Sequence, residues 1–89
     1  MFVVVEHTIT NPGVFFGLVS KAAEAPSGIK ALQFFPSMSK DRAVCLWEAN
    51  SVEAVKGFLE PLSAPSSRNT YYTVDSTKAM GLPTKVSTA

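Results

Sequence analysis

Residues 2–8 read FVVVEHT, and this short stretch decides how the chain folds. Three consecutive valines carry stiff, β-branched side chains, so they favour a strand over residues 2–9. Apolar side chains at successive positions indicate that both faces of this strand are covered. The run ends in Glu6 and His7, whose side chains point to opposite faces because strand side chains alternate.

Helix and strand patterns follow one another through the rest of the chain. Apolar residues at helical spacing predict helices over residues 12–25 and 51–62, and β-favouring runs predict strands over residues 29–35, 42–48 and 70–74. Asn11 caps the first helix. Asn50 or Ser51 caps the second, which Pro61 should end or kink. Residues 75–82 are expected to form one further short helix.

The order of elements is β-α-β-β-α-β, which predicts an α+β fold of the ferredoxin-like type. Right-handed crossovers turn this order into a four-stranded antiparallel sheet, in the spatial order 4-1-3-2, with two helices on one face. Residues 1–83 are expected to form a single domain and residues 84–89 a flexible tail. Six Phe, two Tyr and one Trp are many for an 89-residue chain. The helix-free face is therefore expected to pair in a homodimer, as in a dimeric α+β barrel.

Composition excludes several classes of function. The net charge is +1, from 8 basic and 7 acidic residues without a basic cluster, so no nucleic-acid partner is expected. No apolar run approaches the ~20 residues that span a membrane, and the apolar start is too short for a signal peptide. One cysteine cannot form an intrachain disulfide, which fits a reducing, cytoplasmic location.

The candidate catalytic residues are Glu6 and His7, and the strand at 42–48 decides what surrounds them. The register that we expect groups the side chains of these two strands into two sets: Phe2, Val4, Glu6, Ala43, Cys45 and Trp47 on one face, and Val3, Val5, His7, Val44, Leu46 and Glu48 on the other. The first set mixes large, small and acidic side chains, which suits a cavity. Glu6 is therefore expected to be more buried than His7, with a raised pKa, whereas His7 should lie at the rim of the sheet.

Four further residues are candidates for ligand binding. Trp47 and Tyr72 are aromatic residues on strands, and such side chains often line pockets as well as cores. Gln33 lies within an apolar strand and must find hydrogen bonds if it is buried. Cys45 has the position of a small core residue, and its activation would require a cationic neighbour that the sequence does not reveal.

Three stretches resemble a bacterial family of short, stand-alone ferredoxin-like domains of unknown function, some of which are described as nickel-binding. They are VVVEHT (residues 3–8), GIKALQFF (28–35) and AVCLWEA (43–49). The whole chain is more distantly similar to the dimeric α+β barrel superfamily, which includes antibiotic-biosynthesis monooxygenases, muconolactone-isomerase-like proteins and stress-responsive barrel proteins. The resemblance implies a homodimer with a small-ligand cavity. Glu6, His7 and Glu48 lie at matching polar positions, although many relatives have Arg where this chain has His7.

These observations leave three functions open. The first is a homodimeric barrel protein that binds a small apolar or aromatic molecule or a metal ion. The second is a cofactor-independent enzyme of the monooxygenase or isomerase type, with Glu6 or His7 as proton acceptor. The third is a structural dimerisation module. No cofactor is expected, but a divalent metal held by His7, carboxylates and a second subunit stays open, since one histidine and one cysteine cannot complete a structural zinc site.

Overall fold

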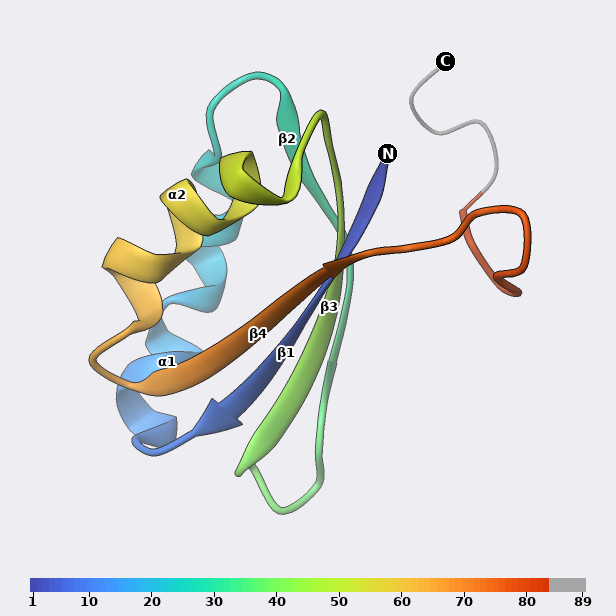
Figure 1. Cartoon of the computed structure of the whole chain (residues 1–89). Coiled ribbons are helices and arrows are strands. Elements are labelled where there is room, and N and C mark those ends of the chain that lie inside the picture. The colour runs from blue at the N-terminus through green and yellow to red at the C-terminus, as the bar shows by residue number, and fades with distance from the viewer. Residues whose placement is uncertain (84–89) are drawn as a thin grey trace.

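The chain folds into one antiparallel sheet with its helices packed on one face (Figure 1). The computed structural model describes residues 1–83; the expected flexible tail, 84–89, lies outside the described residues. The elements are β1 (Phe2–Ile9), α1 (Pro12–Gly17), the 3₁₀ helix η1 (Val19–Glu24), β2 (Ile29–Pro36), β3 (Arg42–Ala49), α2 (Val52–Ser63) and β4 (Ser67–Thr73).

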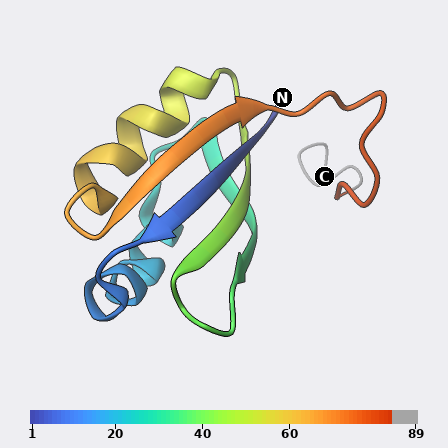
Figure 2. The same cartoon turned by 60° about the horizontal axis from the view of Figure 1, so that its bottom comes forward.

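The four strands lie in the order β2-β3-β1-β4, which is the spatial order that the sequence predicts. The turned view in Figure 2 shows the helices on the same side of the sheet. Strand β1 pairs antiparallel with both β3 and β4, and Phe2 lies opposite Glu48. Glu48 is therefore at the other end of the sheet from Glu6, as expected. The predicted α+β architecture with an antiparallel sheet is confirmed.

The first helical segment is shorter than predicted. Asn11 caps α1 by accepting a hydrogen bond from the backbone N–H of Val14, but the α-helix ends at Gly17. The chain then continues as 3₁₀ turns, in which the N–H of Lys21 donates to the carbonyl of Leu18. Glycine weakens a helix because it loses more backbone entropy than other residues, so the α-helix predicted up to residue 25 stops there.

Helix α2 has the predicted length but begins and ends one residue later than predicted. Of the two candidate caps, Ser51 is the one used, and its hydroxyl accepts from the N–H of Ala54 at 3.1 Å. The helix continues past Pro61 to Ser63, whose hydroxyl donates to the carbonyl of Leu59. The short helix predicted over residues 75–82 is wrong: this segment forms turns, because the carboxylate of Asp75 accepts the N–H of Thr77.

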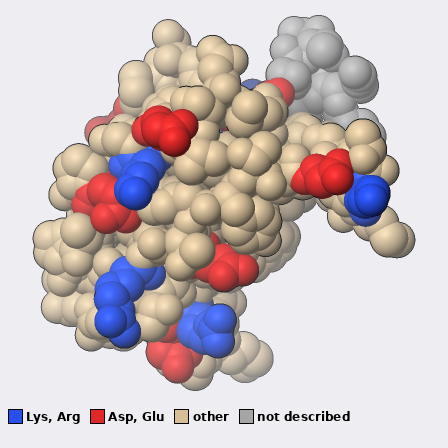
Figure 3. Space-filling view, viewed as in Figure 1, with Lys and Arg blue, Asp and Glu red and all other residues tan. Residues whose placement is uncertain are grey.

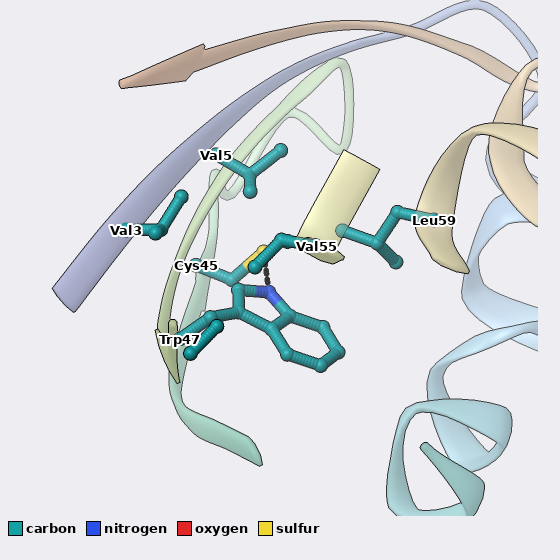
Figure 4. Close-up of a cluster of buried hydrophobic side chains, with 7 residues drawn as sticks. Val3, Val5, Cys45, Trp47, Val55 and Leu59 are labelled. Atoms are coloured by element: carbon teal, nitrogen blue, oxygen red, sulfur yellow. Dashed lines mark hydrogen bonds between the residues drawn. The ribbon is translucent and has the colours of Figure 1, made fainter. Parts of the chain in front are cut away.

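The register between β1 and β3 contradicts the expected grouping of faces. Val3 lies opposite Trp47 and Val5 opposite Cys45, so residues of the same parity share a face. Figure 4 shows these four side chains pointing from the two strands toward Val55 and Leu59. The physical reason is the size of Trp47, which is 1% exposed and fills the space beneath α2. His7 consequently shares its face with Cys45 and Trp47, and Glu6 does not.

Candidate functional site

A cavity of about 470 Å³ lies between the sheet and its helices. We call it the helix-side cavity. Most of its walls are apolar, from α1, η1, β2 and α2, and they include Phe15, Leu18, Val19, Ala22, Phe34 and Leu59. Its volume falls within the ~300–1,000 Å³ that is usual for small-molecule sites. An apolar pocket of this size with few polar groups is the common form of a ligand site.

The polar side of this cavity comes from His7 and Cys45, not from Glu6. His7 is 4% exposed and Cys45 is 7% exposed, and both border the cavity. Glu6 is exposed on the opposite face of the sheet, where it pairs with Val44 and Thr70 in the two ladders. The expectation that Glu6 is the more buried of the pair is therefore wrong. It depended on a register that the packing of Trp47 reverses.

Hydrogen bonds fix which nitrogen of His7 carries its proton. Nδ1 lies 2.6 Å from Oδ1 of Asn69. That amide oxygen can only accept, because the amide nitrogen of Asn69 lies 2.9 Å from a carboxylate oxygen of Glu60 and must donate to it. Nδ1 of His7 is therefore the protonated nitrogen. In neutral His7, Nε2 keeps a free lone pair.

That lone pair faces the thiol of Cys45. Nε2 of His7 lies 3.0 Å from Sγ, so the thiol donates to the imidazole. The indole N–H of Trp47 donates to the same sulfur at 3.3 Å, as the dashed line in Figure 4 marks. The thiol thus has a base on one side and a hydrogen-bond donor on the other.

The network continues through Asn69 to the surface. The amide nitrogen of Asn69 also donates to the hydroxyl of Ser63 at 2.8 Å, and the hydroxyl of Tyr71 donates to Glu60 at 2.6 Å. Within residues 1–83, every buried side-chain nitrogen and oxygen that the structure describes has a hydrogen-bond partner. A fully satisfied network of this kind holds each member in one orientation.

Burial keeps the thiol and the imidazole uncharged. It raises the pKa of Cys45 to about 11, and it lowers the pKa of His7 against the opposing effects of Asn69 and Glu60. Hydrogen bonds from Tyr71 and Asn69 lower the pKa of Glu60. The pKa of Tyr71 rises, first through burial and then through its bond to Glu60. At neutral pH the pair is therefore a thiol and a neutral imidazole, not a thiolate and an imidazolium.

The other predicted ligand-binding residues divide between the two faces. Trp47 and Gln33 border the helix-side cavity. Tyr72 does not: it pairs with Val4 and is 47% exposed on the helix-free side, which we call the open face. A second hollow, of about 440 Å³, lies there between the strands and residues 74–82, and Gln33 borders this one as well. Trp47, Gln33 and Cys45 are thus together at the helix-side cavity, whereas Tyr72 borders only the second hollow, which Gln33 and Cys45 also border.

The side chains that one copy of the chain brings to the cavity supply fewer donors than a divalent metal site needs. Among residues 1–83, no three His, Cys, Asp or Glu side chains gather as ligands. His7 and Cys45 supply two donors, whereas a stable site for a divalent metal needs a third or fourth ligand.

Sequence reasoning missed Asn69 and Glu60 altogether. Asn69 precedes the aromatic pair of β4, and its register opposite His7 brings its amide to the imidazole. Glu60 reaches the network from the last turns of α2. The alternation of Asn69 and Tyr71 along one strand was the available signal, but it became meaningful only once β4 was known to lie beside β1.

Basic and acidic side chains are interspersed on the face of the molecule that Figure 3 shows. Within residues 1–83, no helix combines the length and the apolar composition required to cross a bilayer.

Comparison with known proteins does not assign a function to this site. No family model, curated protein or solved structure matches the chain. Functional reasoning therefore starts from the helix-side cavity and the residues His7, Cys45 and Asn69.

Proposed function

We propose that this chain is a binding protein for a small apolar or aromatic molecule, held in the helix-side cavity. The observation that carries the proposal is the coincidence of an apolar cavity of about 470 Å³ with a neutral imidazole and a thiol on its wall. Apolar walls stabilise the body of a ligand by removing it from water, at about 25 cal/mol per Å². Polar groups at one place orient the ligand.

Trp47 makes this proposal testable without a label, because it is the one tryptophan of the chain and it borders the cavity. N-phenyl-1-naphthylamine is a suitable probe, since its emission rises in apolar surroundings and it accepts excitation energy from indole. We expect saturable binding that quenches the fluorescence of Trp47.

A matched pair of variants locates the binding. Ala22→Phe places a ring into the cavity from η1, and we expect it to weaken probe binding at least ~10-fold, which corresponds to about 1.4 kcal/mol. Ala64→Phe makes the same change at an exposed position after α2 and should leave binding unchanged. Equal binding by both variants, with circular dichroism confirming that both are folded, would show that the dye binds elsewhere and would refute the proposal.

An enzymatic role is the second candidate, with His7 as the proton acceptor in cofactor-independent chemistry. It is favoured by the hydrogen bond from Nδ1 to Asn69, which leaves Nε2 as the basic nitrogen, 3.0 Å from the Cys45 thiol at the wall of the cavity. A C–H acid such as a 1,3-diketone should then exchange its hydrogen for deuterium faster with this protein than with His7→Gln. Equal exchange rates would remove this candidate and leave the binding role intact.

We also propose that two copies pair through the open face, as in a ferredoxin-like dimeric α+β barrel. The support is the apolar character of that face, where Phe35 is 59% exposed beside Val44 and Tyr72 is 47% exposed beside Val4. Light scattering should give the mass of a dimer, and Phe35→Glu should give a monomer. Met38→Glu adds the same charge in the turn after β2 and should stay dimeric. A monomeric wild-type protein at micromolar concentration would refute the pairing.

A further inference from the structure

Cys45, His7 and Asn69 are joined by two hydrogen bonds in an order that resembles a nucleophile, its base and the group that orients the base. The thiol is 3.0 Å from Nε2, and Nδ1 is 2.6 Å from the amide oxygen. A nucleophile within hydrogen-bond distance of a base, with the base held by a third group, is the common arrangement for covalent catalysis. The binding role proposed above requires only that these groups are polar. It does not require that a nucleophile, a base and an orienting group follow one another.

We propose that the Cys45 thiol, with His7 as its base, covalently captures α,β-unsaturated carbonyl compounds that enter the helix-side cavity. This inference rests on the proposed binding function, because the compound must first occupy that cavity. Asn69 is a positioning residue that keeps the proton on Nδ1 and so leaves Nε2 free to accept one.

The surroundings select the kind of electrophile. The walls of the cavity are largely apolar, including Phe15, Ala22 and Leu59, so an uncharged compound with an apolar body is favoured over a charged one. The thiol is a soft nucleophile and reacts readily with soft carbon centres, such as the β-carbon of an enone. A cavity of about 470 Å³ has room for a molecule with one aromatic ring and a short enone chain.

The addition balances without an oxidant, a reductant or a leaving group. The S–H bond breaks and its proton passes to Nε2 of His7, while Sγ forms a bond to the β-carbon. The π electrons of the C=C bond move toward the carbonyl as an enolate. His7 then returns the proton to the α-carbon. The product is a thioether, and the imidazole is neutral again.

The charge states of Cys45 and His7 indicate that His7 removes the thiol proton during the attack. A thiolate and an imidazolium are not formed beforehand. Burial favours the neutral thiol and the neutral imidazole. The indole N–H of Trp47 donates to the sulfur and stabilises the negative charge that develops there during the attack. The other ionisable groups that face this region are Glu60 and Lys56 of α2, Tyr71 of β4 and Lys30 at the edge of the cavity.

Intact-mass measurements with trans-4-phenyl-3-buten-2-one test the inference. We expect one adduct at pH 7, formed at least ~10-fold faster than with N-acetylcysteine, and Cys45→Ser should abolish it because Cys45 is the one cysteine of the chain. His7→Gln should slow the addition about 100-fold. A native rate equal to that of the free thiol would overturn the proposal.

The saturated analogue 4-phenyl-2-butanone separates this inference from the binding role. If the analogue quenches Trp47 but the enone forms no adduct, covalent capture is wrong and binding stands. If neither compound affects Trp47, covalent capture is wrong, and the binding role fails as well only if N-phenyl-1-naphthylamine also leaves Trp47 unquenched.

A pH profile of the wild-type rate covers the case in which His7→Gln does not fold. General-base delivery predicts a nearly flat rate between pH 7 and 9 and a decrease at acidic pH, once His7 takes up a proton. A rate that rises tenfold per pH unit between 7 and 9 would mean that solvent-formed thiolate reacts, and it would overturn the role of His7.

Discussion

Replacing Asn69 by Leu should destabilise the protein by roughly 2–4 kcal/mol. Leucine has nearly the shape of asparagine, so it fills the space and excludes water, but it makes no hydrogen bond. The imidazole N–H of His7 then has no acceptor at a position that is 4% exposed, which costs about 1–3 kcal/mol. The hydrogen bonds from the Asn69 amide to Glu60 and Ser63 are lost as well. Their cost is nearer to 1 kcal/mol, because water can replace Asn69 at the less buried carboxylate and the Ser63 hydroxyl keeps its bond to the carbonyl of Leu59.

Urea unfolding followed by Trp47 fluorescence measures this loss. The indole is 1% exposed, so its emission should shift strongly when the core opens. With a slope of about 1 kcal/mol per molar urea, the midpoint should fall by at least ~2 M. Thr70→Val changes the neighbouring, exposed position of β4 and should alter stability by less than about 0.5 kcal/mol.

A double-mutant cycle with His7→Leu decides whether the cost arises from the pair. The two single changes remove the same hydrogen bond, so the double variant should lose about 1–2 kcal/mol less than their sum. An additive cycle, or a loss below 0.5 kcal/mol for Asn69→Leu, would show that the network contributes little and would refute this account of His7. All variants should be compared at one protein concentration, since the proposed dimerisation would add to apparent stability.

Three further predictions concern pH, packing and backbone conformation. As pH falls below about 6.5, the unfolded chain binds a proton at His7 before the folded chain does, because burial lowers the folded pKa. Stability should therefore decline, by up to about 1.4 kcal/mol per pH unit while only the unfolded chain is protonated, and the decline should disappear in His7→Gln. Val5→Ala should lower the free energy of unfolding in urea by about 2 kcal/mol, since Val5 is fully buried. The same change at the half-buried Val4 should cost less than half of that. Equal costs would contradict the assignment of faces. Gly57→Ala should raise the melting temperature, because Gly57 lies inside α2 with no atom near an added Cβ. Gly28→Ala should lower it, because Gly28 has a φ of +96° that favours glycine. A higher melting temperature for Gly28→Ala would contradict this reasoning.

Local patterns were sufficient to predict the elements and their order. The valine run of β1, the cap at Asn11 and the apolar spacing of α2 depend on residues close together in the chain, and each is found in the structure. The order of strands in the sheet also followed, because the handedness of crossovers leaves few alternatives. Where local preferences were weak, as at Gly17 and in residues 75–82, the predicted helices were shortened or lost.

The alternation of side chains along β1 determined from sequence alone that Glu6 and His7 lie on opposite faces, because the strand repeat is a property of the backbone. Which of the two faces the helices was decided by the register with β3, and a shift of one residue would have exchanged them. The burial of Trp47 beneath α2 fixes that register. The meeting of Cys45, His7 and Asn69 joins three strands that are far apart in the chain. No local preference encodes such a contact, since it exists only when the whole sheet has assembled.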